Sequence, residues 1–193
     1  MSGIFGIFNR NGEPVEKNIA DVMLEAMSYW KPDDMCTWVD GPVVLGHTML
    51  WNTPESKFER LPLAHDTCVL SMDARIDNRD QLLEELDLPD RPISEIGDSE
   101  FILAAYKKWG EESPKYLLGD FTFAIWDSKK KQLFCARDHV GVKQFYYHLS
   151  DDLCLFGNDL KGLIKYPNIS QKINDEAVAS YIVKNELISN ELT

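Results

Sequence analysis

The sequence predicts an α+β protein in which two sheets are covered by helices. Apolar runs of strand length stand near both ends of the chain, whereas apolar residues at helical spacing occur between them. In the second half, two pairs of strand-like runs are each separated by a short polar turn, as in β-hairpins. Because a sheet or a helix must bury its apolar face against another layer, this order favours two packed sheets with helices outside them.

The N-terminal segment is predicted to be a buried strand. After Ser2 and Gly3, the apolar run of residues 4–8 begins without a break, although chain ends are normally frayed. If Met1 is removed, Ser2 carries both a free amine and a hydroxyl, and such an amine can act as the base for its own side chain. An ordinary first strand that follows a serine explains the same residues.

The spacing of apolar residues predicts helices over residues 19–27, 82–86, 98–109 and 177–182. Val22 is expected on the inner face of the first helix. Asp77 or Asn78 is expected to cap the second helix, and Asp98 together with Ser99 the third.

Apolar runs predict further strands over residues 43–47, 68–72, 121–126, 132–136, 145–148 and 153–156. The segment between the first two of these carries Pro54 and Pro62 and is expected to be a loop.

Composition limits the classes of function. A net charge of −12 repels phosphate backbones, so a nucleic-acid partner is not expected. No apolar run has the length of a membrane span and the N-terminus lacks the layout of a signal peptide, so no membrane partner is expected. Cys36, Cys68, Cys135 and Cys154 are scattered without zinc-site spacing, which predicts a reduced, cytoplasmic chain without a metal site.

Several segments, taken in order, resemble the glutaminase domain of asparagine synthetases, which belongs to the class II glutamine amidotransferase family. They are Ser2–Gly6, Leu45–His47, Gly97–Glu100, Gly119–Asp127 and Ala136–Tyr147. The two long segments are mostly scaffold: Gly119 and Gly141 are expected to permit tight turns, and Arg137 to pair with Asp138.

The resemblance implies a four-layer αββα sandwich of two antiparallel sheets, the N-terminal-nucleophile fold, over residues 1–165. Residues 166–193 are then expected to lead into a C-terminal ATP-dependent synthetase domain of the same polypeptide, which would be the main partner. ATP and Mg²⁺ are implied for that domain, and no cofactor is expected in the present sequence. Glutamine or a peptide is the implied substrate, asparagine biosynthesis is the family's setting, and a homodimer is compatible with the resemblance.

The resemblance fails at residues that the family uses to cleave glutamine. The family nucleophile is an N-terminal Cys, and the matching residue is Ser2, whose hydroxyl needs a strong, positioned base. An engineered replacement would also explain the serine. The Arg that clamps the glutamine carboxylate is matched by Met49, which cannot hold an anion.

The family's Asn-Gly-Glu turn, whose Asn and Gly donate to the oxyanion, is matched by Asp73, Ala74 and Arg75. Losing one oxyanion donor typically costs about 10²–10³ in rate, and a carboxylate at this position would repel the oxyanion. Asp98 matches the residue that pairs with the amino group of glutamine, although a role as a helix cap explains it equally well.

Three hypotheses follow. The first is the amidotransferase-like domain of an asparagine-synthetase-type ligase with lost or reduced glutaminase activity. The second is a working amidotransferase or amidohydrolase that uses Ser2 on glutamine or on another substrate, with Arg75 as an anion ligand. The third is a noncatalytic module that binds a peptide or protein through Trp30, Trp38 and Trp51, although burial in the core is the more ordinary place for a tryptophan.

Overall fold

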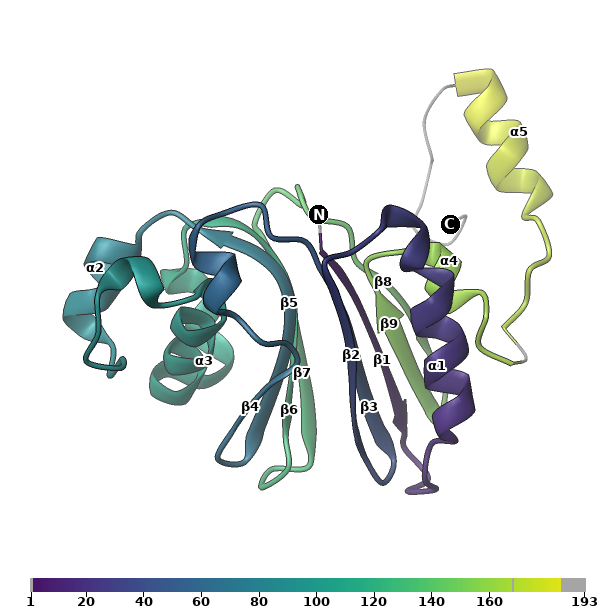
Figure 1. Cartoon of the computed structure of the whole chain (residues 1–193). Helices are drawn as coiled ribbons and strands as arrows, with labels where there is room; N and C mark the ends of the chain where they lie inside the picture. The colour runs from purple at the N-terminus through teal and green to yellow at the C-terminus, as the bar shows by residue number, and fades with distance from the viewer. Residues whose placement is uncertain (1, 168, 185–193) are drawn as a thin grey trace.

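In the computed structural model, which describes residues 2–167 and 169–184, two antiparallel sheets pack face to face. Helices cover the outer face of each sheet (Figure 1). The α+β class and the αββα order of layers are therefore confirmed.

Sheet A has the strand order β2-β3-β1-β9-β8. Its strands are β1 (Gly3–Asn9), β2 (Asp34–Asp40), β3 (Val43–Met49), β8 (Tyr146–Leu149) and β9 (Leu153–Gly157). β1 lies in the middle because it pairs with β3 on one side and with β9 on the other. Its residues from Gly3 to Ile7 are buried, so the N-terminal strand is the centre of the sheet, as predicted.

Sheet B has the strand order β4-β5-β6-β7. Its strands are β4 (Leu63–His65), β5 (Cys68–Ile76), β6 (Gly119–Asp127) and β7 (Gln132–Arg137). β5 and β6 pair along their whole length, so that Asp73 lies opposite Thr122 and Arg75 opposite Asp120. This register places the end of β5 beside the start of β6.

The helices divide between the two outer faces. α1 (Lys17–Ala26) and α4 (Leu160–Leu163) cover sheet A, whereas α2 (Arg79–Glu85) and α3 (Asp98–Trp109) lie outside sheet B (Figure 1). α5 (Asp175–Lys184) extends away from both sheets (Figure 1). Short 3₁₀ helices are η1 (Ser28–Trp30), η2 (Glu55–Phe58), η3 (Ile93–Glu95) and η4 (Gly110–Tyr116).

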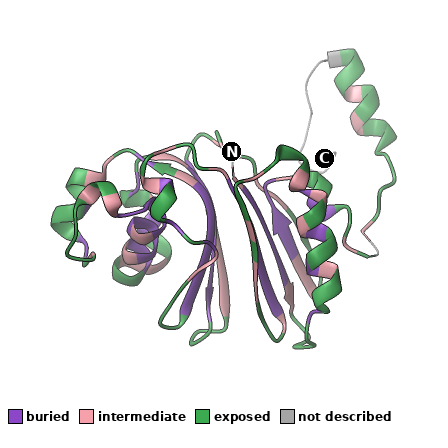
Figure 2. Ribbon diagram, viewed as in Figure 1, coloured by how far each residue is buried: buried purple, intermediate pink, exposed green. Residues whose placement is uncertain are grey.

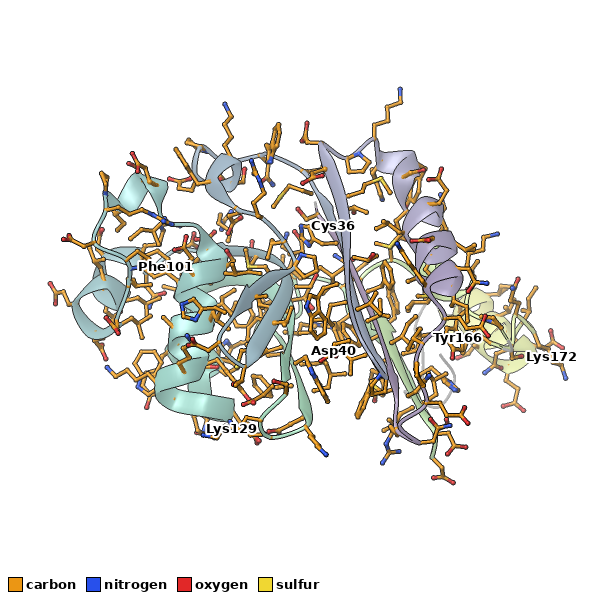
Figure 3. The ribbon with its side chains drawn as sticks, turned by 60° about the horizontal axis from the view of Figure 1, so that its bottom comes forward. Cys36, Asp40, Phe101, Lys129, Tyr166 and Lys172 are labelled. Carbon is orange, nitrogen blue, oxygen red and sulfur yellow. The ribbon has the colours of Figure 1, made fainter. Side chains whose placement is uncertain are left out.

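Three apolar clusters hold the layers together. The first joins α3 to sheet B around Phe101 and Phe123, and the second joins α1 to sheet A around Phe5. The third fills the space between the sheets, with Leu45 and Trp126 among its members. The inner strands are buried and the outward helix faces exposed (Figure 2), and side chains fill the spaces between the ribbons (Figure 3).

Two strands lie where the sequence predicted none. β2 is an edge strand with mostly exposed or half-exposed residues, and therefore lacks an apolar run. β4 is only three residues long and lies inside the expected loop. Neither strand has enough buried residues to produce the period-2 pattern on which strand prediction rests.

Some predicted burial is also wrong. Val22 is 52% exposed, because α1 turns Ala20 and Met23 toward sheet A instead. Trp30 and Trp51 are exposed on the surface and do not belong to the core. These residues lie in short connecting segments or beside a buried stripe, where the local sequence does not determine which side faces inward.

Two glycines meet backbone requirements that other residues cannot. Gly119 has φ +145°, and a Cβ atom there would lie 2.0 Å from the carbonyl oxygen of Arg75. Gly141 has φ +71°, and its Cβ would lie 1.5 Å from the Arg137 guanidinium. Arg137 does not pair with Asp138 as expected, because Asp138 accepts hydrogen bonds from the main-chain nitrogens of Val142 and Lys143.

Gly119→Ala is expected to lower the free energy of unfolding by at least about 3 kcal/mol, because the β5 backbone must move to admit the methyl group. Gly12→Ala is the matched control: Gly12 also has positive φ, at +83°, but its Cβ would meet nothing within 4 Å. The control should lose only about 1–2 kcal/mol through backbone strain. Urea unfolding measures the free energy of unfolding of both variants. Equal losses would contradict the close approach of Gly119 to the Arg75 carbonyl oxygen.

Candidate active site

Ser2 is held in place because β1 is fixed on both sides. The Gly3 nitrogen donates to Thr48 Oγ1 at 3.0 Å. The Asn158 side chain accepts from the Ile4 nitrogen at 2.8 Å and donates to the Ser2 carbonyl oxygen, also at 2.8 Å. Asn158 is buried and follows β9 directly, so its amide group continues the β1–β9 ladder by one more step.

The Ser2 side chain meets few polar groups. Its Oγ accepts a hydrogen bond from the Leu50 nitrogen at 3.2 Å and lies 3.9 Å from Met49 Sδ. The Ser2 main-chain nitrogen donates to Asp73 Oδ1 at 3.2 Å. Asp73 and Met49, which the resemblance matches to positions of the family's glutamine pocket, lie beside Ser2.

Asp73 forms an ion pair with Lys143 in a nearly closed environment. Lys143 Nζ lies 3.0 Å from Asp73 Oδ2, and the two side chains are 15% and 5% exposed. Burial raises the pKa of the Asp73 carboxyl, while the neighbouring Lys143 ammonium opposes this shift. Oδ2 accepts no well-aligned hydrogen bond from the described residues, so Lys143 neutralises its charge mainly by proximity.

The loop after β7 brings Lys143 to this place. Asp138 accepts from the nitrogens of Val142 at 2.8 Å and Lys143 at 2.9 Å, which folds the loop into a tight turn. No local pattern predicts this contact, since Lys143 stands 70 positions after Asp73. A buried carboxylate nevertheless needs a counter-charge, so a buried Asp73 implies a basic partner from elsewhere in the chain.

The Asp73 carboxylate places hydrogen-bond acceptors beside Ser2. An ionised carboxylate only accepts hydrogen bonds, so Asp73 cannot donate to an oxyanion. If Met1 is removed, the free Ser2 amine would lie against the Asp73 carboxylate.

Arg75 lies at the end of β5, but its guanidinium is already engaged. Nε donates to Asp77 Oδ1 at 2.9 Å, and an Nη atom lies 3.5 Å from Asp120 Oδ2. An incoming anion would have to compete with these two carboxylates. Ala74 packs toward the cluster beneath α3.

Asp98 is buried at the start of α3 and is bound to Arg79. Arg79 donates to Asp98 Oδ1 and also to the main-chain oxygens of Ile93 and Ile96. The other carboxylate oxygen accepts from the Ile76 nitrogen at 3.3 Å. The expected cap role is wrong, because Asp98 is the first helical residue and makes no capping hydrogen bond. Glu100 of the helix itself accepts from the Gly97 nitrogen at 3.2 Å, and the Ser99 nitrogen has an acceptor from outside the helix.

Glu59 provides that acceptor. Its Oε1 accepts from the Ser99 nitrogen at 2.8 Å, and Glu59 is 8% exposed. Burial raises the pKa of Glu59 to about 7, while the Ser99 main-chain hydrogen bond opposes the shift. Glu59, Arg79, Lys143 and Asn158 are thus the polar residues that sequence reasoning missed at this end of the molecule.

Two cavities among the described residues, of about 670 and 810 Å³, are lined by neither Ser2 nor Asp73. Within residues 2–167 and 169–184, no group of three or more His, Cys, Asp or Glu side chains is arranged to hold a metal ion. Among the helices of this same part of the chain, none is long and apolar enough to cross a bilayer.

A family model described as a glutamine amidotransferase domain matches residues 1–193. The chain belongs to the glutamine amidotransferase domain family. The expected kinship with asparagine synthetases is also confirmed. The chain is 32% identical over 179 residues to asparagine synthetase (glutamine-hydrolyzing) 3 of Bacillus subtilis, covering 90% of the chain and 29% of that relative. It is 31% identical to putative asparagine synthetase 2 of Methanocaldococcus jannaschii, covering 94% and 39%.

These relatives are much longer than the amidotransferase domain, which spans only 29% and 39% of their lengths. Among solved structures, the fold resembles glutamine phosphoribosylpyrophosphate amidotransferase from Bacillus subtilis, complexed with ADP and GMP, at a TM-score of 0.64. That likeness covers 85% of this chain and 43% of the other at 15% identity, and it confirms the N-terminal-nucleophile fold.

Lys143→Met is expected to destabilise the amidotransferase domain by about 3–5 kcal/mol at pH 8, because it removes the lysine counter-charge of the buried Asp73 carboxylate. Asp73→Asn added to Lys143→Met should recover most of this loss. Because the pKa of Asp73 is already raised, the Lys143→Met loss should shrink as the pH falls and the carboxyl is protonated. A double-mutant cycle by urea unfolding measures the coupling, and additive losses would show that the pair is not coupled.

Glu59 should make the domain less stable as the pH rises. Because the pKa is raised from 4.5 to about 7 on folding, its contribution is fully present below pH 4.5 and is lost as the pH passes through 7, by about 3 kcal/mol in all. Glu59→Gln should flatten this part of the profile in urea unfolding between pH 4.5 and 8. Glu84→Gln, on the exposed surface of α2, serves as the control, and its stability should depend on pH as that of the unmodified chain does.

Proposed function

We propose that this amidotransferase domain serves an asparagine-synthetase-like, ATP-dependent amide-forming ligase and that its own glutaminase activity is lost or much reduced. One observation carries the proposal: the Asp73 carboxylate, paired with Lys143, contacts the Ser2 main-chain nitrogen where the family resemblance places an oxyanion donor. The other departures from the family pattern act in the same direction.

Cleavage of glutamine needs a nucleophile, a base and donors for the developing oxyanion. Ser2 is a weaker nucleophile than the family cysteine, and after removal of Met1 its amine would lie against the Asp73 carboxylate, to which the Ser2 nitrogen already donates. Removing one oxyanion donor alone costs about 10²–10³ in rate. A negative charge in its place raises the barrier further.

Recognition of glutamine is weakened as well. Met49 offers a thioether where the family has a guanidinium, and Arg75 is engaged by Asp77 and Asp120. Asp98 matches the family residue for the amino group, but its carboxylate already accepts hydrogen bonds from Arg79 and Ile76. A bound glutamine would therefore have to displace existing interactions at both of its charged ends.

The remaining role is that of a scaffold for a synthetase domain in the same polypeptide. Support comes from the length of the relatives, of which the chain spans 29–39%. In this proposal ATP and Mg²⁺ act in that other domain, and residues 166–193 lead into it. α5 presents the exposed apolar residues Val178, Tyr181 and Ile182, which suits a helix that packs against a further domain.

A second candidate function is that of a Ser2-dependent amidohydrolase acting on another substrate. The hydrogen bond from the Leu50 nitrogen to Ser2 Oγ favours it, because a donor at this hydroxyl helps to orient the nucleophile. Asp73 would then bind a cationic group of the substrate, or of the Ser2 terminus itself, in place of an oxyanion.

The glutaminase proposal is tested by incubating the chain with glutamine after intact mass has shown that Met1 is absent. Glutamate release is expected to equal that of Ser2→Ala, and an electrophilic glutamine analogue should leave Ser2 unmodified. The Ser2→Cys variant should release glutamate at least about 100-fold more slowly than a glutamine-hydrolysing relative, because its oxyanion site still lacks a donor.

Glutamate release faster than that of the Ser2→Ala variant, or a covalent adduct on Ser2, would refute the proposed loss of glutaminase activity. An adduct with a different amide substrate but not with the glutamine analogue would favour the second candidate.

A further inference from the structure

A segment with few buried residues connects β3 to β4. We call residues 51–60 of this connection the strap, which includes η2. Of these residues, all of which the structure describes, only Ser56 and Glu59 are buried. The two ends of the strap are fixed, one by a hydrogen bond of 2.8 Å from the Trp51 nitrogen and the other by the burial of Leu61. The part between them therefore depends on few contacts for its position.

The two buried residues of the strap have different partners. Ser56 Oγ donates to the Thr53 carbonyl oxygen at 2.7 Å, and the Ser56 nitrogen donates to Thr53 Oγ1 at 3.2 Å, so these bonds stay within the strap. Glu59 Oε1 instead accepts from the Ser99 nitrogen at 2.8 Å. Ser99 lies in the first turn of α3, where a main-chain N–H group has no partner inside the helix. The Glu59 carboxyl is thus the polar tie between the strap and α3.

This tie places two carboxyls beside one guanidinium. The charge of Asp98 is near enough to Glu59 to raise the pKa that burial has already raised, and the charge of Arg79 acts in the opposite direction. Arg79, however, donates to Asp98 and to the carbonyl oxygens of Ile93 and Ile96. Within the described part of the chain Glu59 forms no ion pair, so an ionised Glu59 adds a second negative charge without a cation of its own.

The other charged groups around the strap do not neutralise this carboxyl. The Arg60 guanidinium donates to two main-chain carbonyl oxygens, and Arg91 pairs with Glu100. Burial raises the pKa of Asp98, and the charge of Glu55 in η2 raises it further. The surroundings of the tie therefore favour a protonated carboxyl over an ionised one.

We propose that the strap is a pH-sensitive cover on the start of α3, which is released when Glu59 loses its proton. In the docked state the neutral carboxyl accepts the hydrogen bond from Ser99. Once ionised, the carboxylate moves into water, the strap leaves α3 between its two fixed ends, and the ion pair of Asp98 with Arg79 becomes accessible. The proposal is independent of the glutaminase question, because it uses no residue in contact with Ser2.

The direction of the pH effect follows from the two states of Glu59. Burial raises its pKa from 4.5 to about 7 in the docked state, whereas an undocked carboxyl in water has the ordinary value. The docked state is therefore favoured most below pH 4.5 and loses this advantage as the pH rises through 7. Between pH 5 and pH 8 the ratio of undocked to docked strap should rise about 50- to 100-fold.

Hydrogen exchange of the ¹⁵N-labelled chain, followed by NMR between pH 5 and pH 8, tests this proposal. After correction for the intrinsic exchange rate, the protection of the Ser99 amide should fall about 50- to 100-fold over this range. Because the release is local, addition of about 1 M urea should change the Ser99 protection little. The amide of Ala124, in the middle of β6, should instead follow unfolding of the whole domain and lose protection in urea.

Two variants identify the titrating group. Glu59→Gln keeps an acceptor oxygen but cannot ionise, so the corrected Ser99 protection should stay within about twofold from pH 5 to pH 8. Glu55→Gln, in η2 of the same strap, is the matched control and should keep the pH dependence of the unmodified chain. The carboxyl ¹³C signal of Glu59 in the unmodified chain covers the case in which the Glu59 variant does not fold, and its expected midpoint is about pH 7.

Four results would overturn the proposal. One is a Ser99 protection that stays constant with pH after correction. Another is the same protection and the same urea response for Ser99 and Ala124, which would show that only the whole domain opens. The third is a pH dependence that persists in Glu59→Gln, and the fourth is a Glu59 carboxyl midpoint at its ordinary value of 4.5.

Discussion

The pairing of β1 on both of its sides is the constraint on which the rest of the structure depends. A chain end normally has one neighbour at most, yet β1 lies between β3 and β9 and is buried from Gly3 to Ile7. The Asn158 side chain extends this two-sided pairing by donating a hydrogen bond to the carbonyl oxygen of Ser2. Because these hydrogen bonds hold the main chain of Ser2 in one position, the groups around Ser2 form a fixed chemical environment.

That environment is dominated by charge compensation. Asp73 and Lys143 neutralise each other beside Ser2, and Glu59, Asp98 and Arg79 form a second buried charged group at the start of α3. Burying charges is costly unless they are paired, so each member depends on its partner. Both groups link segments distant in sequence. The polar residues near Ser2 thus act as structural ties between the two sheets and the loops at their ends.

The sequence allowed the fold to be predicted where the pattern was local or the resemblance specific. The hairpins β6–β7 and β8–β9 follow from apolar runs around polar turns, and Asp73 was placed near Ser2 by the match to the family. Lys143 and Arg79 were missed because their partners are distant in sequence and no local period encodes such contacts. β2 and β4 were missed because edge strands need little apolar sequence.

The order of the strands has a consequence for synthesis on the ribosome. All of sheet B comes from one continuous stretch, residues 63–137, whereas sheet A takes β1–β3 from before it and β8–β9 from after it. Sheet B can therefore close while translation continues. The nascent β1, with β3 on one flank, must leave its other flank open until residues 153–158 emerge. A growing polypeptide of this kind exposes an apolar strand throughout the synthesis of sheet B, which makes it a natural client for chaperones that shield such segments.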